Sequence, residues 1–201
     1  MLPKNLERVG LMETDDLSVA GLEKQADVIW ITGLSGAGKT TLAYSVTGLL
    51  RARCQPVIML DGDELRAVLG AAAISAANHG REGRLSLALQ YARLCQLISR
   101  QGITVVIATI SLFHEVHAWN RTHLPGYFEV FLNVPQAELR RRDPKGIYRR
   151  FDAGEIRDVA GLDLTVDEPQ AADWVIDFDP SHSVTALAEE LLARLQTRKA
   201  R

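Results

Sequence analysis

The sequence contains little cysteine and no long apolar run. Its 201 residues include only two cysteines, Cys54 and Cys95, and neither lies in a C-x-x-C pair. This excludes a disulfide framework, so we expect a reduced, cytoplasmic setting. No segment approaches the ~20 apolar residues that a membrane-spanning helix needs. Residues 1–16 lack the apolar stretch of a signal peptide, so no membrane partner is predicted.

The chain also lacks a strong excess of charge of either sign. Its formal net charge is −2, which leaves no basic footprint for nucleic acid. Apolar residues make up 47% of the chain and charged residues 24%, an ordinary balance for a globular protein. We find no internal repeat and no low-complexity stretch. A chain of this length suffices for one α/β domain with a substantial core and is short for two.

A glycine-rich motif is the most informative feature that is present. Residues 33–40 read Gly-Leu-Ser-Gly-Ala-Gly-Lys-Thr, a full match to G-x-x-x-x-G-K-[ST]. An apolar stretch typical of a strand precedes it, and apolar residues at helical spacing follow it. In this context backbone N–H groups surround an anion, Lys39 approaches the β- and γ-phosphates, and Thr40 offers a hydroxyl to Mg²⁺. A chance glycine-rich turn is the alternative, and a dinucleotide site is excluded because no G-x-G-x-x-G is present.

Strand-like and helix-like segments alternate along the rest of the chain. The pattern predicts an α/β fold of three layers, with a central parallel sheet between helices. We expect residues 1–26 to form an N-terminal extension and residues 27–201 to form one domain, with a charged lid segment at about 143–168. The strands are predicted at 28–32, 56–60, 103–108, 127–134 and 174–178. The helices are predicted at 39–51, 64–69, 81–101, 115–122 and 184–198, with one more starting at Pro135.

Two carboxylates flank a glycine where the second predicted strand ends. Asp61 and Asp63 would lie beside the phosphate loop, because ligands gather at the carboxyl ends of parallel strands. One carboxylate could hold Mg²⁺ through water, and the other could orient or deprotonate an acceptor hydroxyl. Arg66 follows within one helical turn and could bind an anionic acceptor. An acidic helix cap is the alternative for this pair.

These motifs occur in an order that resembles the adenylylsulfate kinase family. The order runs from the phosphate loop through Leu-Asp-Gly-Asp-x-x-Arg at 60–66 and Arg-Asp-Pro-Lys-Gly-Ile-Tyr at 142–148 to Gly-Glu-Ile at 154–156. The resemblance covers about residues 27–179. It implies a P-loop kinase that transfers the γ-phosphate of ATP to the ribose 3′-hydroxyl of adenylyl sulfate with Mg²⁺. It also implies a homodimer, since relatives often pair.

The resemblance further implies a set of site residues. The catalytic residues would be Lys39, Asp61 and Asp63, and Mg²⁺ would lie at Thr40 and Asp61, partly through water. ATP would be bound by Gly33, Leu34, Ser35, Gly36, Ala37, Gly38, Lys39, Thr40, Thr41 and Arg142. The acceptor would be bound by Asp63, Arg66, Arg84, Ile110, Ser111 and Lys145. Lys145, Arg149 and Arg150 would close a lid that excludes water, although a solvated charged loop is the alternative.

The chain departs from the family pattern mainly on the acceptor side. Residues 83–90, 109–114 and 159–163 replace the family's Asp-Arg-x-Glu-Asn-Ile-Arg-Arg, Phe-Ile-Ser-Pro-Phe-Arg and Phe-Thr-Gly-Ile-Asp. The aromatic of Leu-Gly-Phe-Ser has no clear counterpart in 69–72. Such losses change which acceptor fits. The altered half is similar to cytidine diphosphoramidate kinases, so two acceptors stay open, and the candidates for altered contacts are His79, Arg81, Arg84 and His114.

Other functions are weighed against this hypothesis. For His79 and His117 we favour ordinary structural roles, and a zinc site at His114 and His117 lacks a third ligand. A nucleotide-dependent switch without phosphoryl transfer is disfavoured by Asp61, Asp63 and Lys145. A gluconate- or shikimate-type kinase is disfavoured by the Arg-Asp-Pro-Lys-Gly segment.

Overall fold

The computed structural model describes residues 26–69, 80–124 and 126–199 and contains one parallel sheet. In these residues the sheet has five strands in the order β2-β3-β1-β4-β5. All four pairings are parallel, for example Ile29 with Val106 and with Phe128. The strands are β1 (Val28–Thr32), β2 (Val57–Asp61), β3 (Thr104–Ala108), β4 (Tyr127–Asn133) and β5 (Trp174–Asp177). The predicted parallel sheet is therefore confirmed.

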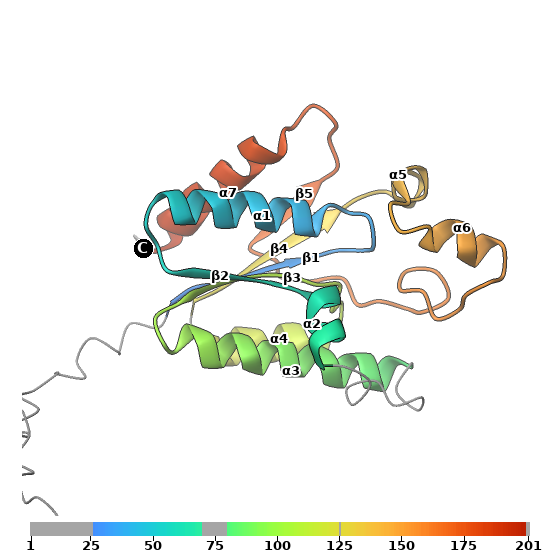
Figure 1. Ribbon diagram of the computed structural model, residues 1–201, viewed down its shortest axis with the longest axis horizontal. Helices are drawn as coiled ribbons and strands as arrows, with labels where there is room; N and C mark the ends of the chain where they lie inside the picture. Colours follow the sequence, from blue (N-terminus) through green and yellow to red (C-terminus); the bar gives the residue numbers. More distant parts are fainter. Residues whose placement is uncertain (1–25, 70–79, 125, 200–201) are drawn as a thin grey trace, which may run out of the picture.

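Helices cover both faces of the sheet (Figure 1). One face carries α1 (Lys39–Ala52) and α7 (Val184–Lys199), and the other carries α3 (Arg81–Ser99) and α4 (His114–His123). The short helices α2 (Gly62–Leu69), α5 (Gln136–Arg142) and α6 (Ile147–Asp152) lie toward the end of the sheet where the strands point. Two separate apolar clusters fill the spaces on the two faces. The predicted three-layer α/β fold is confirmed.

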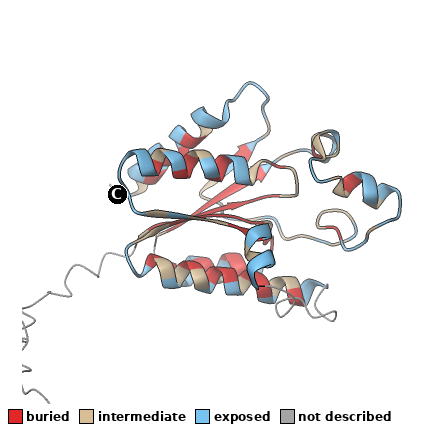
Figure 2. Cartoon of the chain, in the orientation of Figure 1, coloured by how far each residue is buried: buried red, intermediate tan, exposed pale blue. Residues whose placement is uncertain are grey.

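The central strand explains why the sheet is stable. All five residues of β1 are buried, as expected for a parallel strand covered on both faces. Figure 2 shows burial concentrated along the strands and on the sheet-facing sides of the helices. Trp30 is fully buried, whereas Trp119 and Trp174 are half-buried and pack against the edges of the two clusters. The site at the end of the sheet therefore rests on rigid elements.

The structure differs from the sequence predictions mainly at the ends of elements. Pro135 is the N-cap of α5, and its carbonyl oxygen accepts the N–H of Leu139 at 3.1 Å, so the predicted helix is present but its first helical residue is Gln136. The long helix α3 ends at Ser99 because the chain turns through Gly102, whose φ is +78°. The predicted lid segment at 143–168 contains a helix, α6, that the sequence did not indicate. It begins after Gly146 in a left-handed conformation.

Some predictions concern residues outside the described part of the chain. The proposed extension at 1–26 lies almost wholly there, as do His79 and residues 70–72. The division into an extension and one domain stays a prediction. None of the helices in the described residues is long and apolar enough to cross a membrane.

Candidate active site

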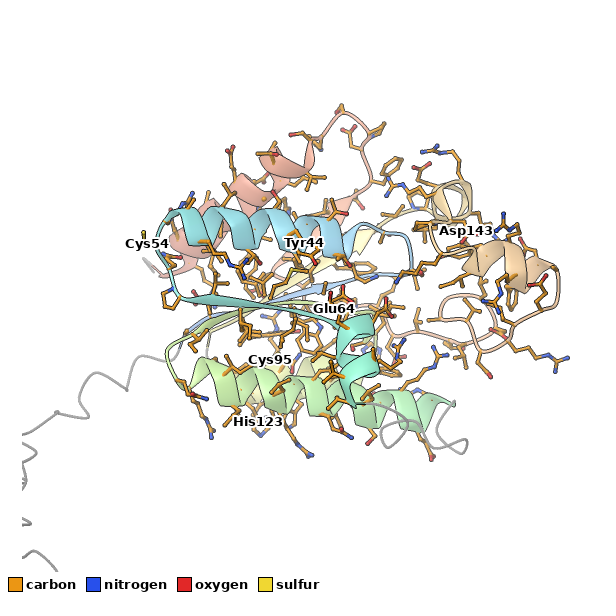
Figure 3. All side chains as sticks on the ribbon, viewed as in Figure 1. Tyr44, Cys54, Glu64, Cys95, His123 and Asp143 are labelled. Atoms are coloured by element: carbon orange, nitrogen blue, oxygen red, sulfur yellow. The ribbon has the colours of Figure 1, made fainter. Side chains whose placement is uncertain are left out.

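A cavity of about 1040 Å³ lies where β1, β2 and β3 end. Figure 3 places Glu64, on α2, and Asp143, before α6, toward this end of the molecule, and Cys54 at the opposite end. Most predicted site residues line the cavity. They are Ser35, Gly36, Gly38, Lys39, Thr40, Thr41, Asp61, Asp63, Arg66, Arg84, Ile110, Ser111, Arg142 and Lys145. The parallel topology therefore brings together residues that are more than 100 positions apart in the sequence.

The glycine-rich loop adopts a backbone that few other residues tolerate. Gly33 has a φ of +145°, and a Cβ there would lie 2.8 Å from the carbonyl oxygen of Leu132. Gly38 is left-handed, with φ 101° and ψ 12°, and directly precedes α1. The first N–H groups of a helix have no partners within it, and they carry the positive end of its dipole. The loop and the start of α1 therefore form a site that favours anions.

Lys39 lies at this helix start and directs its ammonium back toward the loop. Its Nζ donates a hydrogen bond of 2.7 Å to the carbonyl oxygen of Leu34. Burial, together with the positive charge of Lys145, lowers the pKa of Lys39 to about 8, although Asp63 and Asp61 act to raise it. The positive charge of the Lys39 ammonium is therefore only partly neutralised in the free protein. A polyanionic ligand would stabilise this charge.

A short chain of hydrogen bonds links α1 to the two carboxylates at the junction of β2 and α2. The Thr40 hydroxyl donates to Asp61 Oδ2 at 2.7 Å, and the backbone N–H of Asp63 donates to Asp61 Oδ1 at 2.8 Å. Asp61 is buried, and both of its oxygens are thereby oriented. A hydroxyl and a carboxylate in contact are the all-oxygen donor set that Mg²⁺ prefers, so these residues fit a magnesium ion.

Asp63 faces two cations, one from the lid segment and one from its own helix. Lys145 Nζ forms an ion pair with Asp63 Oδ2, and Arg66 Nη1 lies 3.1 Å from Asp63 Oδ1. Burial acts to raise the pKa of Asp63, but the hydrogen bond from Lys145 and the charges of Lys145, Arg66 and Lys39 hold it below its ordinary value. Asp63 is therefore a carboxylate at neutral pH.

The first part of the lid segment is attached to the phosphate loop. The Tyr148 hydroxyl donates to the carbonyl oxygen of Ser35 at 2.9 Å. Asp143 accepts the backbone N–H groups of Tyr148 and Arg149 at 3.1 and 3.0 Å, which caps α6. Arg142 bonds to Glu138 at 2.7 Å, and its guanidinium lies over the ring of Phe178. Movement of a lid would therefore occur beyond this attachment.

The other end of the cavity is lined by α3, the loop after β3 and the later part of the lid segment. Arg84 donates to the carbonyl oxygen of Asp158, which joins α3 to the lid. Arg81 lines the cavity but is engaged by Glu115 at 3.0 Å and by Asp167 at 2.8 Å. This end offers guanidinium groups and an apolar wall, a combination that suits an anionic nucleotide.

Several predicted residues lie behind the cavity wall. Gly33, Leu34 and Ala37 of the loop do not line it, and Ala37 is buried in the core. His114 does not line the cavity, so its candidacy for acceptor contacts is not supported. His117 is buried, with Nε2 3.3 Å from the carbonyl oxygen of Ser111. Within the described residues, no group of three or more His, Cys, Asp or Glu residues could hold a metal.

The sequence analysis missed residues that shape the site from behind. Tyr91 and Thr109 line the cavity and contact the turn between the two carboxylates. Tyr148 is the last residue of the Arg-Asp-Pro-Lys-Gly-Ile-Tyr motif, which does not by itself indicate a contact for its hydroxyl. A tyrosine on the apolar face of a helix is typical of a core residue. The sequence pattern of α3 therefore does not distinguish Tyr91 from its neighbours.

Comparison with known proteins agrees with this geometry. The family model described as adenylylsulphate kinase matches residues 25–177. The cytidine diphosphoramidate kinase of Campylobacter jejuni is 36% identical over 168 residues, covering 84% of this chain and 95% of that protein. The adenylyl-sulfate kinase of Paraburkholderia xenovorans is 39% identical over 171 residues, with coverage of 85% and 93%.

A solved structure extends the comparison to three dimensions. The APS kinase of Mycobacterium tuberculosis, solved in complex with AMPPNP and APS, superposes with a TM-score of 0.77 at 30% identity. The match covers 86% of this chain and 98% of the other. The chain belongs to the adenylylsulphate kinase family of P-loop kinases.

Proposed function

We propose that this kinase transfers the γ-phosphate of ATP to the ribose 3′-hydroxyl of a small nucleotide. The observation that carries the proposal is the convergence of Lys39, the Thr40–Asp61 pair and the Asp63–Lys145 pair on one cavity. A phosphate-binding loop alone would suit a switch or a hydrolase. An oriented carboxylate at the end of β2, which only β3 separates from β1 in the sheet, suits transfer to a hydroxyl.

Each group has a role that follows from its charge and position. The loop N–H groups and Lys39 bind the phosphates and stabilise the charge that spreads over the transferring group. Asp63 accepts the hydrogen of the acceptor hydroxyl and orients its oxygen toward phosphorus. Lys145 pairs with Asp63 in the free protein, and in this proposal it turns to the charge of the transferring phosphoryl group once the acceptor hydroxyl engages Asp63. Arg66 and Arg84 bind the anionic tail of the acceptor.

Thr40 and Asp61 are the residues that would hold magnesium. The ion supplies neutralisation of phosphate charge when it is bound with ATP. In this proposal Asp61 also orients the backbone of Asp63, to which it is already hydrogen-bonded at 2.8 Å. The two carboxylates therefore have separate functions, one toward the metal and one toward the hydroxyl.

Two acceptors are proposed, and one experiment separates them. Adenylyl sulfate is the family's acceptor. Cytidine diphosphoramidate is the alternative, because segments that depart from the family pattern line the acceptor end of the cavity through Gly83, Arg84, Leu87, Ala88 and residues 109–113. Phosphate transfer from ATP to each is measured side by side. A kcat/KM about 10²-fold higher for one of them is expected, because sites that hydrogen-bond their substrate reject analogues. ATP binding with transfer to neither would contradict the proposal and favour a switch.

The lowered pKa of Lys39 predicts how ATP binding depends on pH. Below pH about 8 the ammonium is charged and ready to bind phosphate, whereas above it Lys39 is neutral in the free protein. Bound phosphates raise the pKa again, so binding above pH 8 takes up a proton. Above pH 8 the affinity for ATP should therefore fall about tenfold for each unit by which the pH rises.

Calorimetry in buffers of different ionisation enthalpy measures this proton uptake. Lys39→Arg keeps its charge throughout the range and should bind ATP without proton uptake. A wild-type protein that takes up no proton between pH 8 and 9 would contradict the assignment of Lys39 to the phosphates.

A further inference from the structure

The turn between the two carboxylates is held by a tyrosine from a different element, the helix α3. The hydroxyl of Tyr91, on α3, lies 3.2 Å from the carbonyl oxygen of Gly62 and donates a hydrogen bond to it. Tyr91 is 2% exposed, yet it lines the cavity. No role proposed above for ATP, magnesium or the acceptor requires this hydroxyl. Its partner is the backbone between Asp61 and Asp63.

That hydrogen bond acts on a rigid unit. The carbonyl of Gly62 and the N–H of Asp63 belong to one planar peptide group. Tyr91 binds the oxygen edge of this plane, and Asp61 Oδ1 binds the N–H edge at 2.8 Å. A plane held at both edges cannot rotate without losing one of the two bonds. The direction in which the Asp63 side chain leaves the backbone is therefore fixed by Tyr91 and Asp61 together.

A third contact closes the remaining side of the turn. A Cβ on Gly62 would lie 3.1 Å from Oγ1 and 3.3 Å from Cβ of Thr109. The glycine thus packs tightly on the residue that follows β3. Because Tyr91 comes from α3 and Thr109 from the end of the sheet, the turn is positioned from two independent elements. A helix cap requires only a hydrogen bond from its own carboxylate to the backbone. The additional contacts from Tyr91 and Thr109 are therefore not explained by capping alone.

We propose that Tyr91 is a positioning residue, whose hydroxyl fixes the peptide plane that directs Asp63 toward the acceptor hydroxyl. The inference rests on the proposed function, because it assumes that Asp63 orients that hydroxyl. Burial raises the pKa of Tyr91, so the phenol keeps its proton and remains a donor at neutral pH. The carbonyl oxygen has a second lone pair for the helix bond of α2, so removing the phenol leaves α2 intact.

Tyr91→Phe tests the proposal because it deletes the hydroxyl and keeps the ring. We expect kcat for phosphate transfer to fall about tenfold, since a small misplacement of a reacting group is costly. The KM for ATP should stay within about twofold, because the phosphate loop is untouched. A loss confined to stability, or to ATP binding, would indicate a structural role and overturn the proposal.

Tyr127→Phe is the matched control. Tyr127 is also a buried tyrosine of the same apolar cluster, and its hydroxyl donates to Glu129 Oε1 at 2.9 Å. It does not line the cavity. We expect this variant to be less stable than the wild type while it keeps its kcat. An equal fall in kcat for both variants would overturn the proposal.

A second measurement separates this inference from the proposed function. The amide resonance of Asp63 is recorded by NMR in the ligand-free wild type and in both variants. It should shift in Tyr91→Phe and stay unchanged in Tyr127→Phe, whether or not an acceptor has been found. A wild type that transfers phosphate to no nucleotide would contradict the proposed function. An Asp63 amide that does not respond to Tyr91→Phe would contradict the positioning role.

Discussion

Replacing Lys39 by alanine is expected to lower kcat for phosphate transfer by about 10²–10³-fold, the usual cost of removing one group that stabilises developing charge. The reason is the position of its ammonium, which lies beside the loop at the cavity and is hydrogen-bonded only to the carbonyl oxygen of Leu34 in the described structure. No other described lysine is placed to replace it, because Lys145 belongs to the lid segment and pairs with Asp63. The measurement is steady-state transfer together with the affinity for ATP.

Two further variants decide whether the effect belongs to this charge. Lys39→Met keeps most of the side-chain volume and should be as inactive as the alanine variant. Arg51→Ala removes a cation from the exposed far end of the same helix and should retain full activity. The melting temperature of Lys39→Ala should not fall, because the mutation removes a charge whose burial is unfavourable. Full turnover in Lys39→Ala would exclude the proposed phosphate site.

The fold could be predicted because its determinants are local. The buried run Val28–Thr32 and the broad apolar face of α3 indicate a doubly covered sheet without any knowledge of contacts. The phosphate loop could be predicted for the same reason, since its glycines and Lys39 are adjacent in sequence. Topology then places Asp61 beside the loop, because carboxyl ends of parallel strands meet at one edge.

The remaining features depend on contacts between distant residues. The pairing of Lys145 with Asp63 joins positions 82 apart, and that of Tyr148 with Ser35 joins positions 113 apart. No sequence pattern at either residue of such a pair indicates which residue is its partner. The helix α6 was missed because its six residues are too few for periodicity to be visible. Tyr91 was missed because one hydroxyl on an apolar face does not alter that face's pattern.

The two ends of the cavity differ in how firmly the chain itself holds them. At the phosphate end, Lys39 and Tyr148 each donate a partly buried side-chain hydrogen bond to a carbonyl oxygen of the loop, those of Leu34 and Ser35. At the acceptor end, Arg81 is held by exposed ion pairs with Glu115 and Asp167, and Arg84 by one backbone carbonyl. Exposed ion pairs contribute little to stability. We therefore expect exchange of residues at the proposed acceptor end to alter acceptor binding at little cost to the fold.

Replacing Asp63 by asparagine is expected to lower kcat by about 10³-fold, within the range for loss of a group that takes a proton in the transition state. The amide keeps the size of the side chain but cannot accept a proton. It also removes the negative charge that holds Lys145 and Arg66. The KM for ATP should change little, because Asp63 is absent from the loop that binds the phosphates. The expected signature is thus a loss in kcat alone.

The neighbouring carboxylate provides the control for this result. Glu64→Gln removes the same charge one position further along α2. Glu64 also lines the cavity, but no hydrogen bond or ion pair joins its side chain to another described residue, so this variant should keep kcat within about twofold of the wild type. If both variants lost activity equally, the net charge of the turn would be responsible. If Asp63→Asn turned over as fast as the wild type, Asp63 would have only the capping role. The acceptor hydroxyl would then be oriented without Asp63, and Tyr91 would have no catalytic carboxylate to position. A fall in kcat confined to Asp63→Asn would instead assign proton acceptance to that single carboxylate.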